Sequence, residues 1–128
     1  GMMRRFHESK AKQASSVQIW GSGTPKREFL HVDDLADGLL PLMLKYEERQ
    51  TINVGTGQDC TILELAQLMK ETVGYRGDIV LDPSKPDGPP RKVVDIGRIE
   101  KLGWKPKKGL REGLASTYSW ALENRVFS

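Results

Sequence analysis

The segment from Thr61 to Gly74, TILELAQLMKETVG, is the part of the sequence that most restricts the fold. Thr61 and Glu64 have the spacing of a capping box, in which each side chain binds the backbone N–H of the other at the start of a helix. Gly74 is suited to the left-handed conformation that ends helices. The sequence therefore predicts an amphipathic helix whose apolar side needs a second layer to cover it. The apolar positions are Ile62, Leu65, Ala66, Met69 and Val73.

Other helical and extended patterns alternate along the chain, and this alternation predicts an α/β or α+β fold. We expect Asp33 or Asp34 to cap a second apolar helix, which should be well buried around 39–44 and kinked at Pro41. Further helices are expected at 2–14, 95–102 and 110–124, the short one capped by Asp95. Extended segments are expected at 17–20, 27–32, 52–54, 78–82 and 93–94, with an irregular proline-rich loop at 83–92.

Composition sets limits on the class of protein. A chain of 128 residues is one domain or a piece of a larger one, and no apolar run approaches the ~20 residues that span a bilayer. Cys60 is the only cysteine and His7 and His31 are the only histidines, so neither a disulfide framework nor a zinc site is expected. We expect a reducing, cytoplasmic compartment and no membrane partner. Gly1 before Met2 is interpreted as a residue left by tag removal.

The glycine-containing loops do not complete a nucleotide fingerprint. Gly21-Ser22-Gly23 and Gly55-Thr56-Gly57 both lack the third glycine, so plain turns are favoured. No Tyr-x-x-x-Lys or Gly-x-Ser-x-Gly pattern is present, and the adjacent acids Asp33 and Asp34 are more typical of a helix start than of an acid–base pair. We therefore predict no catalytic, cofactor-binding or metal-binding residue in this chain.

Cations in stiff loops are the remaining candidates for function. Arg27 follows a Gly/Pro turn, and Arg91 and Lys92 close the proline-rich loop that also holds Lys85 and Asp87. Arginine binds phosphate oxygens through two parallel N–H groups, and proline lowers the ordering cost of a binding loop. Trp20 offers an aromatic face beside the first turn. The competing interpretation is that Trp20 belongs to the core and that the arginines are merely solvated. The net charge of +3 is too small and too scattered to indicate nucleic acid.

Four stretches carry a resemblance: WGSGTPKREFLHVDDLADG, INVGTG, DPSKPDGPPRK and LGWKPKKGLREGLASTYSWALEN. Together they resemble the C-terminal part of the GDP-L-fucose synthase family, within the extended short-chain dehydrogenase/reductase superfamily, over nearly the whole chain. REFLHVDD and NVGTG are widespread in that superfamily, whereas GSGTPKREFLHVDD combined with KPDGPPRK is more specific.

The resemblance implies that the chain is the C-terminal nucleotide-sugar-binding portion, residues 1–128, of an enzyme that epimerises and reduces GDP-4-keto-6-deoxymannose with NADPH. It implies that Arg27 binds the nucleotide diphosphate, that Trp20 lines the sugar-nucleotide pocket, and that Arg5 and Asp87 contact the substrate. The NADP loop and the Ser/Tyr/Lys triad match positions before this chain, in the Rossmann half, so the chain alone is expected to be inactive.

Two alternatives stay open. The chain could be part of another nucleotide-sugar epimerase or dehydratase, or a stand-alone interaction module without catalysis. The resemblance implies a homodimer for the full-length family. For the isolated chain we expect self-association, through edge pairing or exchange of the segment 51–54 next to the apolar helix at 35–44.

Overall fold

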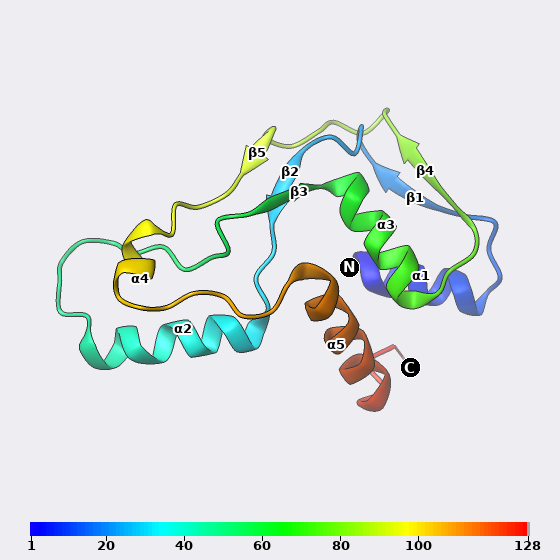
Figure 1. Cartoon of the computed structure of the whole chain (residues 1–128). Helices are drawn as coiled ribbons and strands as arrows, with labels where there is room; N and C mark the ends of the chain where they lie inside the picture. The colour runs from blue at the N-terminus through cyan, green and yellow to red at the C-terminus, as the bar shows by residue number, and fades with distance from the viewer. Residues whose placement is uncertain (128) are drawn as a thin grey trace.

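The computed structural model describes residues 1–127 as a mixed α/β structure (Figure 1). Its helices and strands follow one another along the chain in the alternating manner that the sequence predicts. The helices are α1 (Met2–Ala11), α2 (Val32–Lys45), α3 (Ile62–Val73), α4 (Gly97–Lys101) and α5 (Leu110–Glu123). The strands are β1 (Ser16–Trp20), β2 (Lys26–Glu28), β3 (Asp59–Thr61), β4 (Asp78–Asp82) and β5 (Arg91–Lys92).

The core lies where a small parallel sheet meets three helices. β1 pairs with β4 in parallel, with Val17 opposite Ile79 and Ile19 opposite Leu81. Val17 and Ile19 are buried and alternate with exposed residues, as expected for a strand covered on one face. Beneath this sheet, α1, α3 and α5, together with Tyr75 just after α3, contribute the other buried side chains of the core (Figure 1). These are Phe6, Leu65, Ala66, Met69, Val73, Tyr75, Leu114 and Tyr118.

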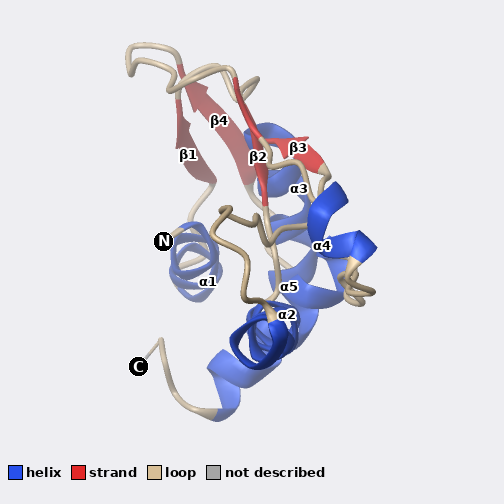
Figure 2. Ribbon diagram, turned by 90° about the vertical axis from the view of Figure 1, so that its left-hand side faces the viewer, coloured by secondary structure: helices blue, strands red, loops and turns tan. Residues whose placement is uncertain are grey.

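A second sheet continues beside the first one. β2 is its middle strand, antiparallel to β3 and parallel to β5, with Arg27 opposite both Cys60 and Lys92. Figure 2 shows β2 and β3 in red beside α3. The sheet is short because proline and glycine flank its strands. Its middle strand, β2, lies between the loops that precede β3 and β5. Among residues 1–127, no helix is long and apolar enough to cross a membrane.

The capping box of α3 is confirmed. The Thr61 hydroxyl accepts from the backbone N–H of Glu64 at 3.0 Å, and the Glu64 carboxylate accepts from the N–H of Thr61 at 2.7 Å. At the other end Gly74 has φ +69°, the left-handed conformation that favours glycine. The predicted apolar stripe is buried at Leu65, Ala66, Met69 and Val73.

The prediction that α2 is well buried is wrong. Its two buried residues are Asp34 and Gly38, and its apolar side chains face solvent. Gly38 is needed because a Cβ there would lie 2.8 Å from the buried Trp104 ring. The cap is also not an aspartate: His31 is the N-cap residue, and its Nδ1 accepts from the N–H of Asp33. The exposed apolar residues include Val32, Leu35, Leu39, Leu40, Met43 and Leu44.

Several extended segments differ from expectation. Residues 52–54 and 93–94 form no strand, because no neighbouring strand lies beside them to accept or donate the backbone hydrogen bonds. Arg91 and Lys92, expected in an irregular loop, instead form β5, and β3 was not expected at all. The extended segment predicted at 27–32 is reduced to β2, and the first helix ends at Ala11. The other helices and strands lie close to where the sequence predicts them, and Asp95 accepts from the N–H of Gly97 at the start of α4.

Candidate anion-binding site

Arg27 lies in β2, the middle strand of the second sheet, where β3 and β5 hold its backbone in place on both sides. Its Nη1 donates to the carbonyl of Lys26 at 2.7 Å and to the carbonyl of Pro89 at 2.8 Å. These contacts orient the guanidinium through neutral acceptors and leave its charge uncompensated. Within residues 1–127, no carboxylate forms an ion pair with Arg27.

Beside Arg27 is a cavity of about 400 Å³. β2 and β3 form one wall of it, and the loop before α5 forms the other. Leu110, the first residue of α5, also lines it, so the positive end of that helix is close to the cavity. The lining residues are Arg27, Phe29, Thr56, Gln58, Asp59, Cys60, Pro106, Lys107, Lys108, Gly109 and Leu110.

The other cations around this cavity are neutralised by carboxylates. Lys107 pairs with Asp37 at 2.7 Å, and Lys108 pairs with Asp33 at 2.6 Å. Hydrogen bonding to its aspartate raises the pKa of each lysine, and the bond from Lys108 lowers the pKa of Asp33. Arg91, another cation of this sheet, pairs with Asp59. Arg27 is therefore the cation on the cavity wall that is left to bind an anion.

Asp34 fixes the wall that carries the two lysines. It is 3% exposed, and its Oδ2 accepts from the backbone N–H groups of Lys107 at 3.0 Å and Lys108 at 2.8 Å. A buried carboxylate with two N–H donors is strongly held, and its removal leaves both donors unpaired. The sequence indicates a helix start at Asp33 and Asp34, and it gives no signal that Asp34 binds a loop more than 70 residues away.

Asp87, predicted to contact substrate, joins the proline-rich loop to the first glycine turn. Its Oδ1 accepts from the N–H of Ser22 at 2.9 Å, and its Oδ2 accepts from the Ser22 hydroxyl at 2.6 Å. These two hydrogen bonds lower the pKa of the Asp87 carboxyl. Gly21 is required here, because a Cβ at this residue would lie 2.2 Å from Asp87 Oδ1. Asp87 thus holds the two loops together on the exposed surface.

Trp20 is not a core residue, contrary to the competing interpretation. It is 67% exposed at the end of β1, on the opposite face from Val17 and Ile19. The Lys85 ammonium lies 5.8 Å from the centroid of the Trp20 ring, within the range of a cation–π contact. An exposed indole with an adjacent cation offers a stacking surface for a planar anionic ligand.

Arg5 extends from α1 to the outer side of the same strand. Its Nη1 donates to the carbonyl of Gln18 at 2.8 Å, two residues before Trp20. The loop 82–90 thus contains Asp87 and contacts Trp20 through Lys85 and Arg27 through Pro89. Arg5 lies further along β1, at Gln18. Of these four predicted residues, Arg27 lines the 400 Å³ cavity, whereas Arg5, Trp20 and Asp87 lie outside it.

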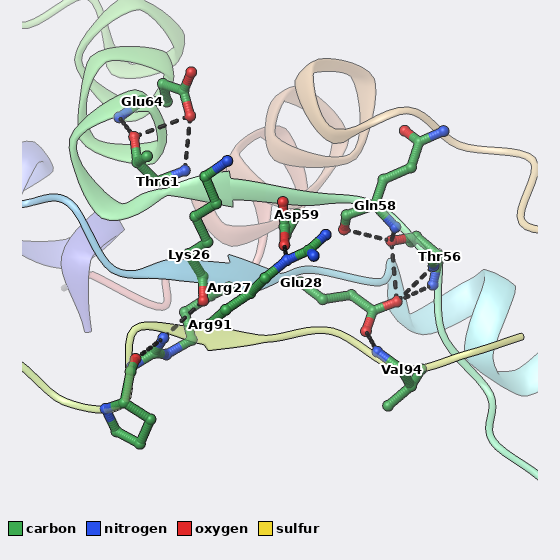
Figure 3. A network of polar contacts seen from close by, with 12 residues as sticks. Lys26, Arg27, Glu28, Thr56, Gln58, Asp59, Thr61, Glu64, Arg91 and Val94 are labelled. Carbon is green, nitrogen blue, oxygen red and sulfur yellow. Dashed lines mark hydrogen bonds and ion pairs between the residues drawn. The ribbon is translucent and has the colours of Figure 1, made fainter.

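Glu28 is a structural residue that sequence reasoning missed. Its carboxylate accepts from the N–H groups of Thr56 and Gly57 and, through Oε2, from the N–H of Val94 at 2.9 Å (Figure 3). The N–H groups of the loop Gly55-Thr56-Gly57 therefore bind a carboxylate of the protein itself. This agrees with the interpretation of that loop as a turn. Alternation along β2 could have placed Glu28 on the face opposite Arg27, but not identified its partners.

The chain is similar to known proteins over nearly its whole length. Residues 1–55 match the NAD dependent epimerase/dehydratase family. The chain is 53% identical over 133 residues to GDP-L-fucose synthase of Escherichia coli K12, covering 97% of this chain and 41% of that protein. It is 52% identical over 123 residues to GDP-L-fucose synthase 1 of Arabidopsis thaliana, covering 96% and 38%. A GDP-L-fucose synthetase structure from Naegleria fowleri bound to NADP aligns with a TM-score of 0.92 and 26% identity, covering 100% of this chain and 40% of that one.

The chain is a mixed α/β structure that aligns with part of the structures of a GDP-L-fucose synthetase and of a UDP-glucose 4-epimerase. In sequence it is homologous to GDP-L-fucose synthases. It spans about two fifths of the length of the relatives described above.

Proposed function

We propose that this chain is the GDP-sugar-binding, C-terminal portion of a GDP-L-fucose synthase. The observation that carries the proposal is the guanidinium of Arg27, which two carbonyl groups orient beside a cavity and which no carboxylate of residues 1–127 neutralises. A nucleoside diphosphate presents the planar, doubly accepting oxygens that a guanidinium binds best. Its negative charge would neutralise Arg27, as the carboxylates of Asp37 and Asp33 neutralise Lys107 and Lys108.

The remaining predicted residues take complementary roles. Trp20 stacks against a flat part of the ligand, and Lys85 beside it adds positive charge. Asp87 keeps the proline-rich loop closed on Ser22, so that the carbonyl of Pro89 stays in place to orient Arg27. Arg5 supplies a further cation along β1. The NADPH site and the catalytic residues belong to the part of the enzyme outside this chain, so the chain contributes recognition and not hydride transfer.

A hybrid enzyme tests this proposal. The aligned 41% of the Escherichia coli enzyme is replaced by this chain, and oxidation of NADPH is followed with GDP-4-keto-6-deoxymannose as substrate. We expect the hybrid to turn over and the chain alone to show no turnover. Arg27→Ala should raise the KM for the GDP-sugar roughly 10- to 150-fold, because a charge-assisted hydrogen bond contributes about 1.5–3 kcal/mol. The KM for NADPH should stay unchanged.

Two further variants sharpen the test. Arg27→Lys should recover part of the affinity, because a point charge lacks the planar fork of the guanidinium. Arg111→Ala is the matched control, because Arg111 is an exposed arginine that pairs with Glu71 and does not line the cavity. An unchanged KM in Arg27→Ala, or an equal rise in Arg111→Ala, would remove Arg27 from the site. A preference for UDP-sugar over GDP-sugar would favour another nucleotide-sugar epimerase.

A further inference from the structure

After α5, the chain turns back and lies against α1. The side-chain amide of Asn124 donates to the carbonyl of Trp120 at 2.9 Å and closes the end of the helix. Arg125 then has φ +53°, a left-handed conformation that reverses the chain direction. The reversal brings Phe127 onto the edge of the core, although it lies far from α1 in the sequence.

Phe127 packs into an aromatic cluster with α1 and α5. Its ring stacks on the His7 ring, with centroids 4.5 Å apart and planes 26° apart. The Nδ1 of His7 is 2.9 Å from the Tyr118 hydroxyl, within hydrogen-bond distance, and the Tyr118 and Phe127 rings are 6.0 Å apart. None of these aromatic residues lines the cavity beside Arg27, so the binding role of the chain does not explain them.

Arg4 holds the same segment from the other side. Its guanidinium lies 5.6 Å from the centroid of Phe127, donates to the carbonyl of Val126 and pairs with Glu8 at 3.6 Å. Positions 4, 7 and 8 share one face of a helix, so the segment 124–127 contacts α1 along a single side. Arg5 follows Arg4 directly and leaves α1 toward Gln18 on β1.

We propose that Phe127 is a positioning residue for Arg5, and this inference rests on the binding role proposed above. α1 has only ten residues, no side-chain cap and one fully buried side chain, Phe6. A helix this short is marginal alone, so tertiary contacts fix its orientation. The contacts of Phe127 with His7 and Arg4 stop α1 from rotating about Phe6. Arg5 then points toward Gln18 of β1, the strand that ends at Trp20 of the proposed site.

A double-mutant cycle in the hybrid enzyme tests this inference. Phe127→Ala should raise the KM for the GDP-sugar roughly two- to tenfold, the range of one aromatic contact, with the KM for NADPH unchanged. Arg5→Ala should raise it at least as much. Because Phe127 acts through Arg5, adding Phe127→Ala to Arg5→Ala should have little further effect. Val126→Ala is the matched control, since it keeps the carbonyl that Arg4 binds.

The outcomes separate the positioning role of Phe127 from the binding role proposed for the chain. Additive effects of the two substitutions, or no effect of Phe127→Ala, would overturn the positioning role and leave the binding role intact. An unchanged KM in Arg5→Ala would overturn both the binding role of Arg5 and the positioning role of Phe127. Hydrogen exchange of the α1 amides in the chain alone should accelerate in Phe127→Ala while that of α3 stays constant; unchanged α1 exchange would contradict the inference. If Phe127→Ala does not fold, Arg4→Gln takes its place in the cycle, because it removes the Arg4 contacts with Val126 and the Phe127 ring.

Discussion

The helices α2 and α3 have similar apolar patterns but opposite environments. α3 buries Leu65, Ala66, Met69 and Val73 between the first sheet and its neighbouring helices. α2 buries only Asp34 and Gly38 and leaves most of its leucines at the surface. An apolar stripe therefore predicts that a helix has a face to cover, but the stripe alone does not identify what covers it. In this chain α2 is held mainly by its carboxylates, which bind Lys107 and Lys108, and by the contact of Gly38 with the Trp104 ring, and not by its leucines.

A matched pair of leucine substitutions gives the largest expected difference. Leu65 is 5% exposed on α3, and Leu40 is 60% exposed on α2. Leu65→Ala should lower the free energy of unfolding by about 2–5 kcal/mol, because it removes buried methyl groups and leaves a cavity. Leu40→Ala should change it by less than about 0.5 kcal/mol. Urea unfolding at low protein concentration measures both, and equal losses would contradict the comparison.

Asp34→Ala should have an intermediate effect. It leaves the N–H groups of Lys107 and Lys108 without their acceptor, at a cost of about 1–3 kcal/mol. The same unfolding assay measures this cost, and Asp37→Ala is the control because its carboxylate forms an exposed ion pair. If Asp34→Ala is no more destabilising than Asp37→Ala, the attachment of α2 must depend on other contacts.

The exposed face of α2 should drive self-association of the isolated chain. An apolar patch of several hundred Å² seldom stays open to water, so we expect the mean mass to rise with concentration. Met43, 83% exposed, lies on this face, whereas Val54 lies in the segment 51–54, which forms no strand. Met43→Lys should lower the mass measured by light scattering, and Val54→Lys should not. The reverse result would indicate edge pairing at 51–54, and a monomer at all concentrations would contradict self-association.

The smallest expected effect is a pH dependence at Asp87. Its pKa is lowered by the hydrogen bonds from Ser22, so the folded state stabilises the charged carboxylate. This contribution is present above the ordinary carboxyl pKa and is lost as the pH falls through the depressed folded value. Unfolding measured below about pH 4 should therefore show a smaller pH dependence in Asp87→Asn than in the parent chain. Identical pH profiles would mean that the bonds to Ser22 do not favour the charged carboxylate.

Sequence patterns predicted the parts of the fold that depend on residues close together in the chain. The capping box at Thr61, the left-handed Gly74 and the helix beginning at Leu110 involve residues within a few positions of one another. The alternation of Val17 and Ile19 likewise predicted β1. Short strands were harder, because β3 and β5 have only three and two residues and exist through pairing with β2. The segment 52–54 has the composition of a strand but no neighbour to pair with.

The candidate site was predictable in its residue types but not in its pairings. Cations in stiff loops indicated an anion, yet the sequence did not separate Arg27 from Arg91, Lys107 and Lys108. The difference arises from Asp33, Asp37 and Asp59, which neutralise those three cations across long sequence separations. Whether the four predicted residues bind a GDP-sugar stays a prediction.

The most direct test is a titration of the ¹⁵N-labelled chain with GDP, followed by NMR on its three tryptophan indoles. Trp20 is 67% exposed in the proposed site, Trp104 is buried against α2, and Trp120 is 59% exposed on α5. The proposal predicts that the Trp20 indole signal moves, with weak affinity, that the other two stay, and that Arg27→Ala reduces the shift. No movement at several millimolar GDP, a concentration at which even weak sites fill, or movement of Trp120 in place of Trp20 would contradict it.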